Sequence, residues 1–203
     1  MAEKLYEQLK SYQQATVIYD FTVKFTEEYI KSYRTKEQMD QAARSGQQNI
    51  AEGSTLGKTS KKSEMKLLGV SRGSLEELLR DYETYLRQNS LQQWEQNSPQ
   101  AMQVRKLVYE IIGDNKKEYS KSDSNIISYL SYSSYLNSAE QAANAMICLI
   151  NQTNLLLDRQ IASCKERFLE KGGFSESLYK DRMAAREKQI AQLDNEKFVP
   201  RDR

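Results

Sequence analysis

The chain contains no histidine among its 203 residues. Histidine is the commonest metal ligand in proteins and the side chain that most often acts as a general base near neutral pH. Its absence removes the usual starting points for metal-dependent and acid–base catalysis. Only two prolines and eight glycines occur, and both residue types disfavour helix interiors. Their scarcity predicts long, uninterrupted helices.

Cysteine and long apolar runs are also scarce. The two cysteines, Cys148 and Cys164, lie sixteen residues apart, which is about 24 Å along one predicted helix and too far for a disulfide. We therefore expect two reduced thiols in a cytoplasmic protein. The longest apolar run is 145–150, whereas a membrane span needs about twenty residues. The first ten residues lack the apolar core of a signal peptide, so we expect no membrane partner.

Charge is abundant but nearly balanced. Thirty basic residues oppose 28 acidic residues, which gives a formal net charge of +2. A dedicated nucleic-acid binder usually carries a larger positive excess. Net charge alone therefore names no partner, although lysines and arginines can still gather on one face after folding.

Apolar residues that recur at steps of three and four predict four long helices. They cover about 3–32, 36–52, 60–89 and 138–171. The first carries two apolar stripes, which predicts burial on two sides, against the bundle and against another subunit. Thr59 or Ser60 is expected to cap the third helix, and Ser138 with Gln141 forms a capping box for the last.

The rest of the chain is less regular. About 91–137 form an insertion, in which Pro99 is expected to start a helix and 115–124 to form a loop. Gly172 and Gly173 are expected to end the last long helix. We therefore divide the chain into a helical bundle over 1–173 and a charged tail over 174–203, with a helix over 176–193.

The segment 42–54, AARSGQQNIAEGS, is the most informative stretch of the sequence. Small or slender residues share one helical face with Met39, which lets a second helix approach closely. Gly53 is predicted to end the helix, and Asn49 to bond either to nearby backbone or across to another helix. The residues of this structural motif are Ala43, Gly46, Asn49, Ile50, Glu52 and Gly53.

With four long helices in place, this motif resembles a string close to RRAAxSIxxNIAEG. That string ends the second helix in a bacterial family of four-helix-bundle proteins encoded by intervening sequences of ribosomal RNA genes. SKK at 60–62 and GSLEEL at 73–78 also resemble the family, and the likeness covers about 5–90. It implies an all-α, up-down four-helix bundle that forms a ring-like homo-oligomer, commonly a homopentamer.

Two further likenesses follow. The strings at 144–161 and 172–174 are similar to a variant of the family with a four-helix-bundle suffix domain. A related branch is the accessory variability determinant of diversity-generating retroelements, which works with a reverse transcriptase and RNA through a basic surface. The resemblance thus implies a link to nucleic acid, and it implies no enzymatic activity.

A basic cluster surrounds the start of the third helix. If it is repeated around a ring, it could neutralise phosphates; the alternative is an ordinary solvated helix face that includes Glu64. Cations at a helix N-terminus oppose the helix dipole, which favours an anionic partner. The cluster consists of Lys58, Lys61, Lys62, Lys66 and Arg72.

Two other segments are weaker candidates for nucleic-acid contact. The tail mixes cations with acids, which favours solvated pairs. Three tyrosines could stack on single-stranded bases or pack over the end of the bundle. The residues concerned are Lys180, Asp181, Arg182, Arg186, Glu187 and Lys188 in the tail, and Tyr129, Tyr132 and Tyr135.

No catalytic constellation is found. Asn49 and Glu52 could suggest a site, but di-metal bundles use Glu-x-x-His pairs, and there is no phosphate loop or nucleophile motif. We expect no enzyme activity, metal or cofactor. The leading hypothesis is a non-catalytic homo-oligomeric adaptor that binds RNA or DNA beside an enzyme such as a reverse transcriptase. The alternative is an oligomeric scaffold that binds another protein.

Overall fold

The computed structural model describes residues 5–114 and 129–197. In these two ranges the chain is helical and contains no strand, so the all-α prediction is confirmed. The predicted loop at 115–124 lies outside the described residues. The elements are the 3₁₀ helices η1 (Leu5–Gln8) and η2 (Tyr129–Asn137) and the α-helices α1 (Lys10–Tyr29), α2 (Tyr33–Leu56), α3 (Lys61–Gln88), α4 (Pro99–Asp114), α5 (Ala139–Lys171) and α6 (Phe174–Lys197).

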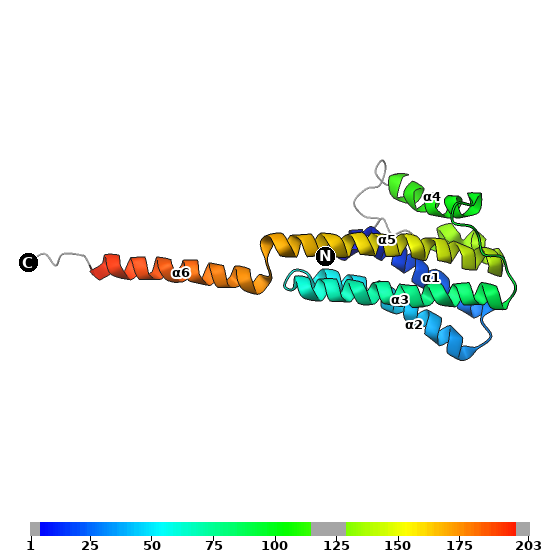
Figure 1. Cartoon of the computed structure of the whole chain (residues 1–203), viewed down its shortest axis with the longest axis horizontal. Helices are drawn as coiled ribbons and strands as arrows, with labels where there is room; N and C mark the ends of the chain where they lie inside the picture. The colour runs from blue at the N-terminus through cyan, green and yellow to red at the C-terminus, as the bar shows by residue number, and fades with distance from the viewer. Residues whose placement is uncertain (1–4, 115–128, 198–203) are drawn as a thin grey trace, which may run out of the picture.

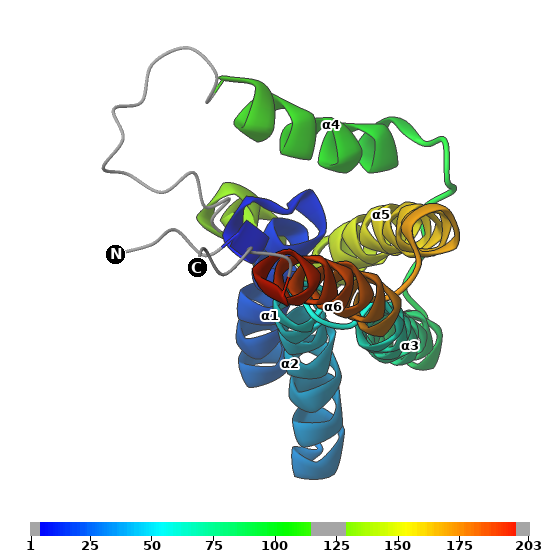
Figure 2. The same ribbon diagram turned by 90° about the vertical axis from the view of Figure 1, so that its left-hand side faces the viewer.

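Four helices share one core. α2 packs against α1 and α3, and α5 packs against α3 and α1, while α4 contacts α5 from outside. Figure 1 shows α6 continuing beyond one end of this group. Figure 2, along the long axis, shows α4 set apart from α1, α2 and α3. None of the helices in the described ranges is long and apolar enough to cross a membrane.

Large side chains from all four helices fill the core. Tyr82 of α3 is fully buried and its hydroxyl lies 3.0 Å from Thr22 Oγ1 on α1. Burial raises the pKa of Tyr82 far above the ordinary value, so the phenol stays neutral and the hydrogen bond is kept inside the core. Other fully buried residues include Ile18, Phe21, Phe25, Met39, Ile50, Leu75, Leu78, Met146 and Ile150.

The first helix is shorter than predicted. Residues 5–8 form a 3₁₀ turn, and α1 runs only from Lys10 to Tyr29. It ends there because Ile30 and Ser32 both adopt extended backbone. Ser32 needs that conformation as the N-cap of α2, where its side chain accepts a hydrogen bond from the backbone N–H of Thr35.

The prediction that Gly53 ends the second helix is wrong. α2 continues to Leu56, and Gly53 is a buried residue within it. A Cβ at Gly53 would lie 3.3 Å from Cβ of Leu67 and 3.4 Å from the backbone oxygen of Glu64. The glycine therefore serves the close packing of α2 on α3, and not a left-handed cap.

Several other predicted boundaries are confirmed. Ser60 caps α3 by accepting a hydrogen bond from the N–H of Ser63, and the helix stops next to Asn89. α4 begins at Pro99, and α5 ends at Gly172, which has a φ of 73°. The capping box at Ser138 does not form, because the Ser138 side chain accepts no hydrogen bond from the start of α5.

The tail is helical, and every residue over 174–192 is exposed. Its helix is longer than the predicted 176–193 and covers Phe174–Lys197. Because two glycines separate it from α5 and it extends past the core, none of its apolar residues at 174–192 is buried.

Candidate nucleic-acid interface

The structural motif on α2 holds α2 against α3. Ala43 and Ile50 are fully buried, and a Cβ at Gly46 would lie 2.7 Å from Cδ2 of Leu75 on α3. Ser71 of α3 donates a hydrogen bond of 2.6 Å to the backbone oxygen of Gly46. Absence of a side chain at Gly46 thus permits a direct bond between a side chain of α3 and the backbone of α2.

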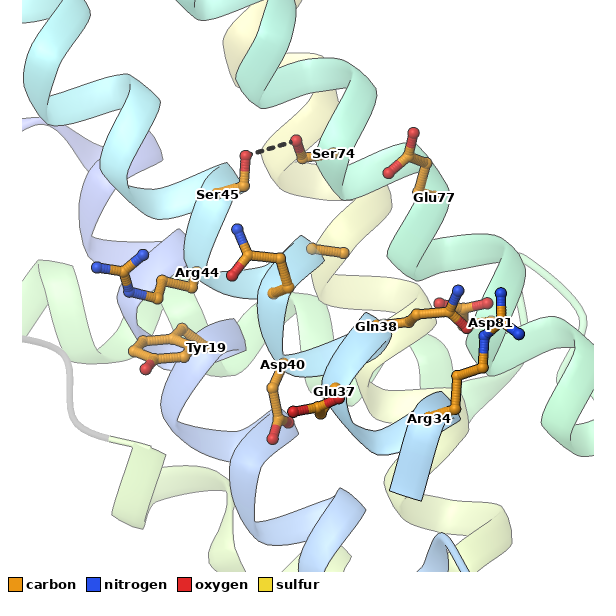
Figure 3. Close-up of a pocket in the computed structure, with 12 residues that line it drawn as sticks. Tyr19, Arg34, Glu37, Gln38, Asp40, Arg44, Ser45, Ser74, Glu77 and Asp81 are labelled. Atoms are coloured by element: carbon orange, nitrogen blue, oxygen red, sulfur yellow. Dashed lines mark hydrogen bonds between the residues drawn. The ribbon is translucent and has the colours of Figure 1, made fainter. Parts of the chain in front are cut away.

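Asn49 stays within its own helix. Its amide donates to the backbone oxygen of Ser45 at 2.8 Å and to Ser45 Oγ at 3.1 Å. Ser45 Oγ in turn lies 2.9 Å from Ser74 Oγ on α3, the dashed line in Figure 3. Of the two alternatives for Asn49, the local backbone bond is the one that the structure shows, and Ser45 makes the link to α3. Glu52 is exposed.

Glu64 lies where the α2–α3 turn meets α5, and it contacts residues of both α3 and α5. It is 7% exposed, and Lys61 Nζ donates to its Oε2 at 2.8 Å. Burial, and then the hydrogen bond and charge of Glu64, raise the pKa of the Cys164 thiol on α5. Glu64 is therefore not part of a solvated face, as one sequence interpretation held; it joins α3 to α5.

The structure divides the predicted basic cluster into two groups. Lys61 is paired with Glu64. Arg72 reaches Glu76 at 2.8 Å and Asp158 on α5 at 3.4 Å. Both cations are therefore already balanced by acids of the same chain, and the Arg72–Asp158 pair links α3 to α5.

The remaining three cations are Lys58, Lys62 and Lys66. All three are exposed, and among the described residues none of them forms an ion pair. Lys62 and Lys66 are one turn apart on α3, so their Cβ atoms are about 6 Å apart, and Lys58 lies in the turn just before α3. We call these three residues the lysine surface.

The lysine surface lies at the end of the molecule from which α6 departs (Figure 1). α5 adds exposed cations at this end, Lys165 and Arg167, on either side of Glu166. Cys164, the neighbour of Lys165, contacts Glu64. Sequence reasoning missed these residues because nothing in the local pattern of α5 tells which part of α3 lies beside it.

The tyrosines and the tail fall into different environments. Tyr132 is fully buried, so it packs on the bundle and its ring is closed to bases; Tyr135 is half-buried. The side chain of Tyr129 lies outside what the structure describes. The four candidate cations of the tail, Lys180, Arg182, Arg186 and Lys188, are by contrast all exposed on α6.

A separate polar groove lies beside α2 (Figure 3). It has a volume of about 850 Å³. Burial raises the pKa of Asp40, against the effect of a hydrogen bond from Thr26, and burial and the charge of Glu77 raise the pKa of Asp81. The groove is lined by Tyr19, Arg34, Glu37, Gln38, Asp40, Gln41, Ala42, Arg44, Ser45, Ser74, Glu77 and Asp81.

The groove is lined by side chains of both charges, and they form no recognisable catalytic arrangement. Two arginines accompany its four carboxylates, so it presents no strong field of one sign. Within 5–114 and 129–197, no group of three or more metal-ligating side chains is found.

A comparison with known protein families identifies the family of the chain. Residues 3–110 match the family described as 23S rRNA-intervening sequence protein. The chain belongs to this family. The match includes α1, α2, α3 and most of α4, and with them the α2 motif and the lysine surface. α5 and α6 lie beyond it, and no curated protein or solved structure matches the chain.

Proposed function

We propose that this member of the 23S rRNA-intervening sequence protein family is a non-catalytic, homo-oligomeric adaptor that binds RNA or DNA. The observation that carries the proposal is the lysine surface. Lys58, Lys62 and Lys66 are exposed at one end of the molecule, whereas neighbouring Lys61 and Arg72 are neutralised by acids. An arrangement that leaves three cations without an ion pair to any described residue, beside two paired ones, suits an anionic partner.

The electrostatics of α3 support the same partner. Lys62 lies in the first turn of α3, where the helix dipole places positive partial charge. Phosphate groups stabilise such a site because they interact favourably with both the dipole and the lysines. Binding of this kind releases counterions, so affinity depends steeply on salt.

Assembly multiplies this surface. We infer an up-down bundle made by α1, α2, α3 and α5, several copies of which form a ring, as a pentamer in the arrangement that the family resemblance implies. Copies of one three-lysine surface on a ring bind a single strand at several points, and the combined affinity exceeds that of one copy. α5 and α6 then correspond to the suffix region, and a cytoplasmic nucleic-acid enzyme, such as a reverse transcriptase, is the expected companion.

The test is a charge reversal with a matched control. The triple variant Lys58→Glu, Lys62→Glu and Lys66→Glu is compared with Lys31→Glu, Arg34→Glu and Arg87→Glu. The control makes the same change of charge at exposed cations around the start of α2 and the end of α3, the opposite ends of the two helices that meet at the lysine surface. Affinity for a labelled single-stranded RNA and for a single-stranded DNA of the same sequence is measured by fluorescence anisotropy from low to physiological salt.

We expect the wild type and the control to bind, with log affinity falling against log salt at a slope of about −2 or steeper if each lysine neutralises one phosphate. The lysine variant is expected to lose binding while it keeps its assembly. Equal affinity and slope in all three proteins would rule out the lysine surface. Absence of RNA and DNA binding by the wild type would favour the oligomeric protein scaffold, for which the exposed apolar residues of α6 are the supporting observation.

A further inference from the structure

Three of the five large apolar side chains that α6 exposes lie on one side of the helix. Tyr179, Met183 and Ile190 are 65%, 36% and 50% exposed. With Arg186 they are spaced by four, three and four residues, which places all four on one side of the helix. We call these four residues the α6 stripe. In proteins, most of the stability of a helix comes from packing such a face against a neighbour.

α5 carries a second exposed face with the same spacing. Leu155 and Leu169 are 60% and 72% exposed, and Ala162 lies midway between them and is exposed as well. Arg159 and Glu166 complete steps of four, three, four and three residues, and both are exposed. We call these five residues the α5 stripe; they point away from the core that the opposite face of α5 fills.

The two stripes of one chain do not meet. α5 ends at Gly172, and α6 then continues away from the bundle, as Figure 1 shows. The α5 stripe therefore lies along the bundle, while the α6 stripe lies beyond its end. Each copy therefore exposes two separate stripes, one on α6 and one on α5.

We propose that the α6 stripe of one copy packs on the α5 stripe of a second copy. The two faces match in three ways. Both repeat with the four–three spacing by which helices interlock, and their lengths are similar, about 16 Å from Tyr179 to Ile190 and about 21 Å from Leu155 to Leu169. Their charges also match when α6 runs parallel to α5 with Met183 opposite Ala162, because Arg186 then lies near Glu166 and the cation of the α5 stripe, Arg159, lies near Tyr179.

This contact joins two different surfaces of the same chain. Such a heterologous contact, repeated from copy to copy, closes into a ring when the rotation between copies allows it, and otherwise it continues as an open chain of copies. It supplies a specific interface for the assembly on which the proposed function rests. Its test does not use nucleic acid, so that either proposal can fail while the other stands.

The first experiment is a disulfide trap between copies. Full-length chains with Met183→Cys are mixed with full-length chains with Ala162→Cys, oxidised, and separated on a non-reducing gel. We expect a covalent dimer of twice the 23.6 kDa chain mass that contains one chain of each kind. The wild type, which keeps Cys148 and Cys164, gives the background.

Three results would overturn the proposal. A covalent dimer made of two Met183→Cys chains would show that α6 pairs with α6. A chain with both substitutions that forms only an internal bridge would show that α6 folds back on its own α5. A mixture that gives no dimer above background would show that the two stripes do not meet.

A charge exchange tests the same contact without cysteine. Arg186→Glu and Glu166→Arg are each expected to lower the fraction of assembled protein in native mass spectrometry, and the double variant is expected to restore it. Lys188→Glu, on the other side of α6, is the control and should leave assembly unchanged. A double variant no better assembled than the single ones, or a monomeric wild type, would contradict the proposed contact.

Discussion

At the scale of single residues, Gly46 sets how near α2 can come to α3. Ser71 reaches the backbone oxygen of Gly46, and Leu75 occupies the space where a side chain at 46 would begin. Two other glycines, Gly69 and Gly73, lie on α3 where, apart from adjoining residues of the same helix, nothing described lies within 4 Å of the place where a Cβ would stand. Glycines of one chain therefore have opposite roles, and substitution by alanine separates them.

Gly46→Ala is expected to lower the free energy of unfolding by about 1–3 kcal/mol, because the new methyl group overpacks a buried contact. Gly69→Ala is the control and is expected to raise the free energy of unfolding by up to about 1 kcal/mol, since it only improves helix propensity. Urea denaturation followed by circular dichroism measures both. An increase in stability with Gly46→Ala would contradict the packing described here.

Two buried asparagines on α5 allow a second comparison between residues of the same type. Asn144 bridges to the chain before α4, accepting from the N–H of Trp94 at 2.7 Å and donating to the backbone oxygen of Gln92 at 2.8 Å. Asn154 is 4% exposed, and neither polar atom of its amide group has a hydrogen-bond partner within 5–114 and 129–197. A buried, unpaired polar group costs free energy, whereas a paired one contributes to stability.

We therefore expect opposite results from the same substitution. Asn154→Leu should raise the free energy of unfolding by about 1 kcal/mol, and Asn144→Leu should lower it by about 1–3 kcal/mol because it leaves the N–H of Trp94 unpaired. Thermal and urea denaturation of the two variants provide the comparison. Equal destabilisation by both would show that Asn154 has a partner.

At the scale of elements, two serines in the same formal position behave differently. Ser60 caps α3 with its side chain, and Ser138 occupies the equivalent position of α5 without a side-chain bond. Ser60→Ala is expected to lower the free energy of unfolding by about 0.5–2 kcal/mol, and Ser138→Ala to change it by a few tenths at most. Losses of equal size would contradict this difference between the caps.

The helices themselves could be predicted from sequence, since Ser60, Asn89, Pro99 and Gly172 mark ends that the structure also has. Periodicity also placed Ala43, Gly46 and Ile50 on a packed face, which is buried. The role of Gly53 could not be predicted. The same residue suits a helix end and a close helix contact, and only the position of Leu67 decides between them.

The candidate site was predicted only in outline. The sequence brings five cations together near the start of α3, but it does not show that Lys61 is balanced by a buried Glu64 or that Arg72 reaches Asp158. Both facts depend on how α5 lies beside α3, and a heptad-like spacing that all the long helices share leaves that alignment open. For the same reason, the sequence does not show that Lys165 and Arg167 lie at the same end of the molecule as the start of α3.

At the scale of the whole molecule, the two proposals describe one assembly with two surfaces. The bundle presents Lys58, Lys62 and Lys66, and α5 and α6 present the stripes that are proposed to join copies. Both surfaces lie toward the end of the molecule at which α6 begins (Figure 1). In an assembly built this way, each added copy brings three further unpaired lysines to the same partner, so assembly and nucleic-acid affinity should rise together.

The most direct measurement is native mass spectrometry of the wild type purified at low salt without nuclease, beside the triple lysine variant. The account predicts that the wild type is a multiple of 23.6 kDa with additional mass that nuclease removes, and that the triple variant forms the same multiple without it. A wild-type assembly of pure protein mass, or additional mass that is equal in both proteins, would contradict nucleic-acid binding through Lys58, Lys62 and Lys66.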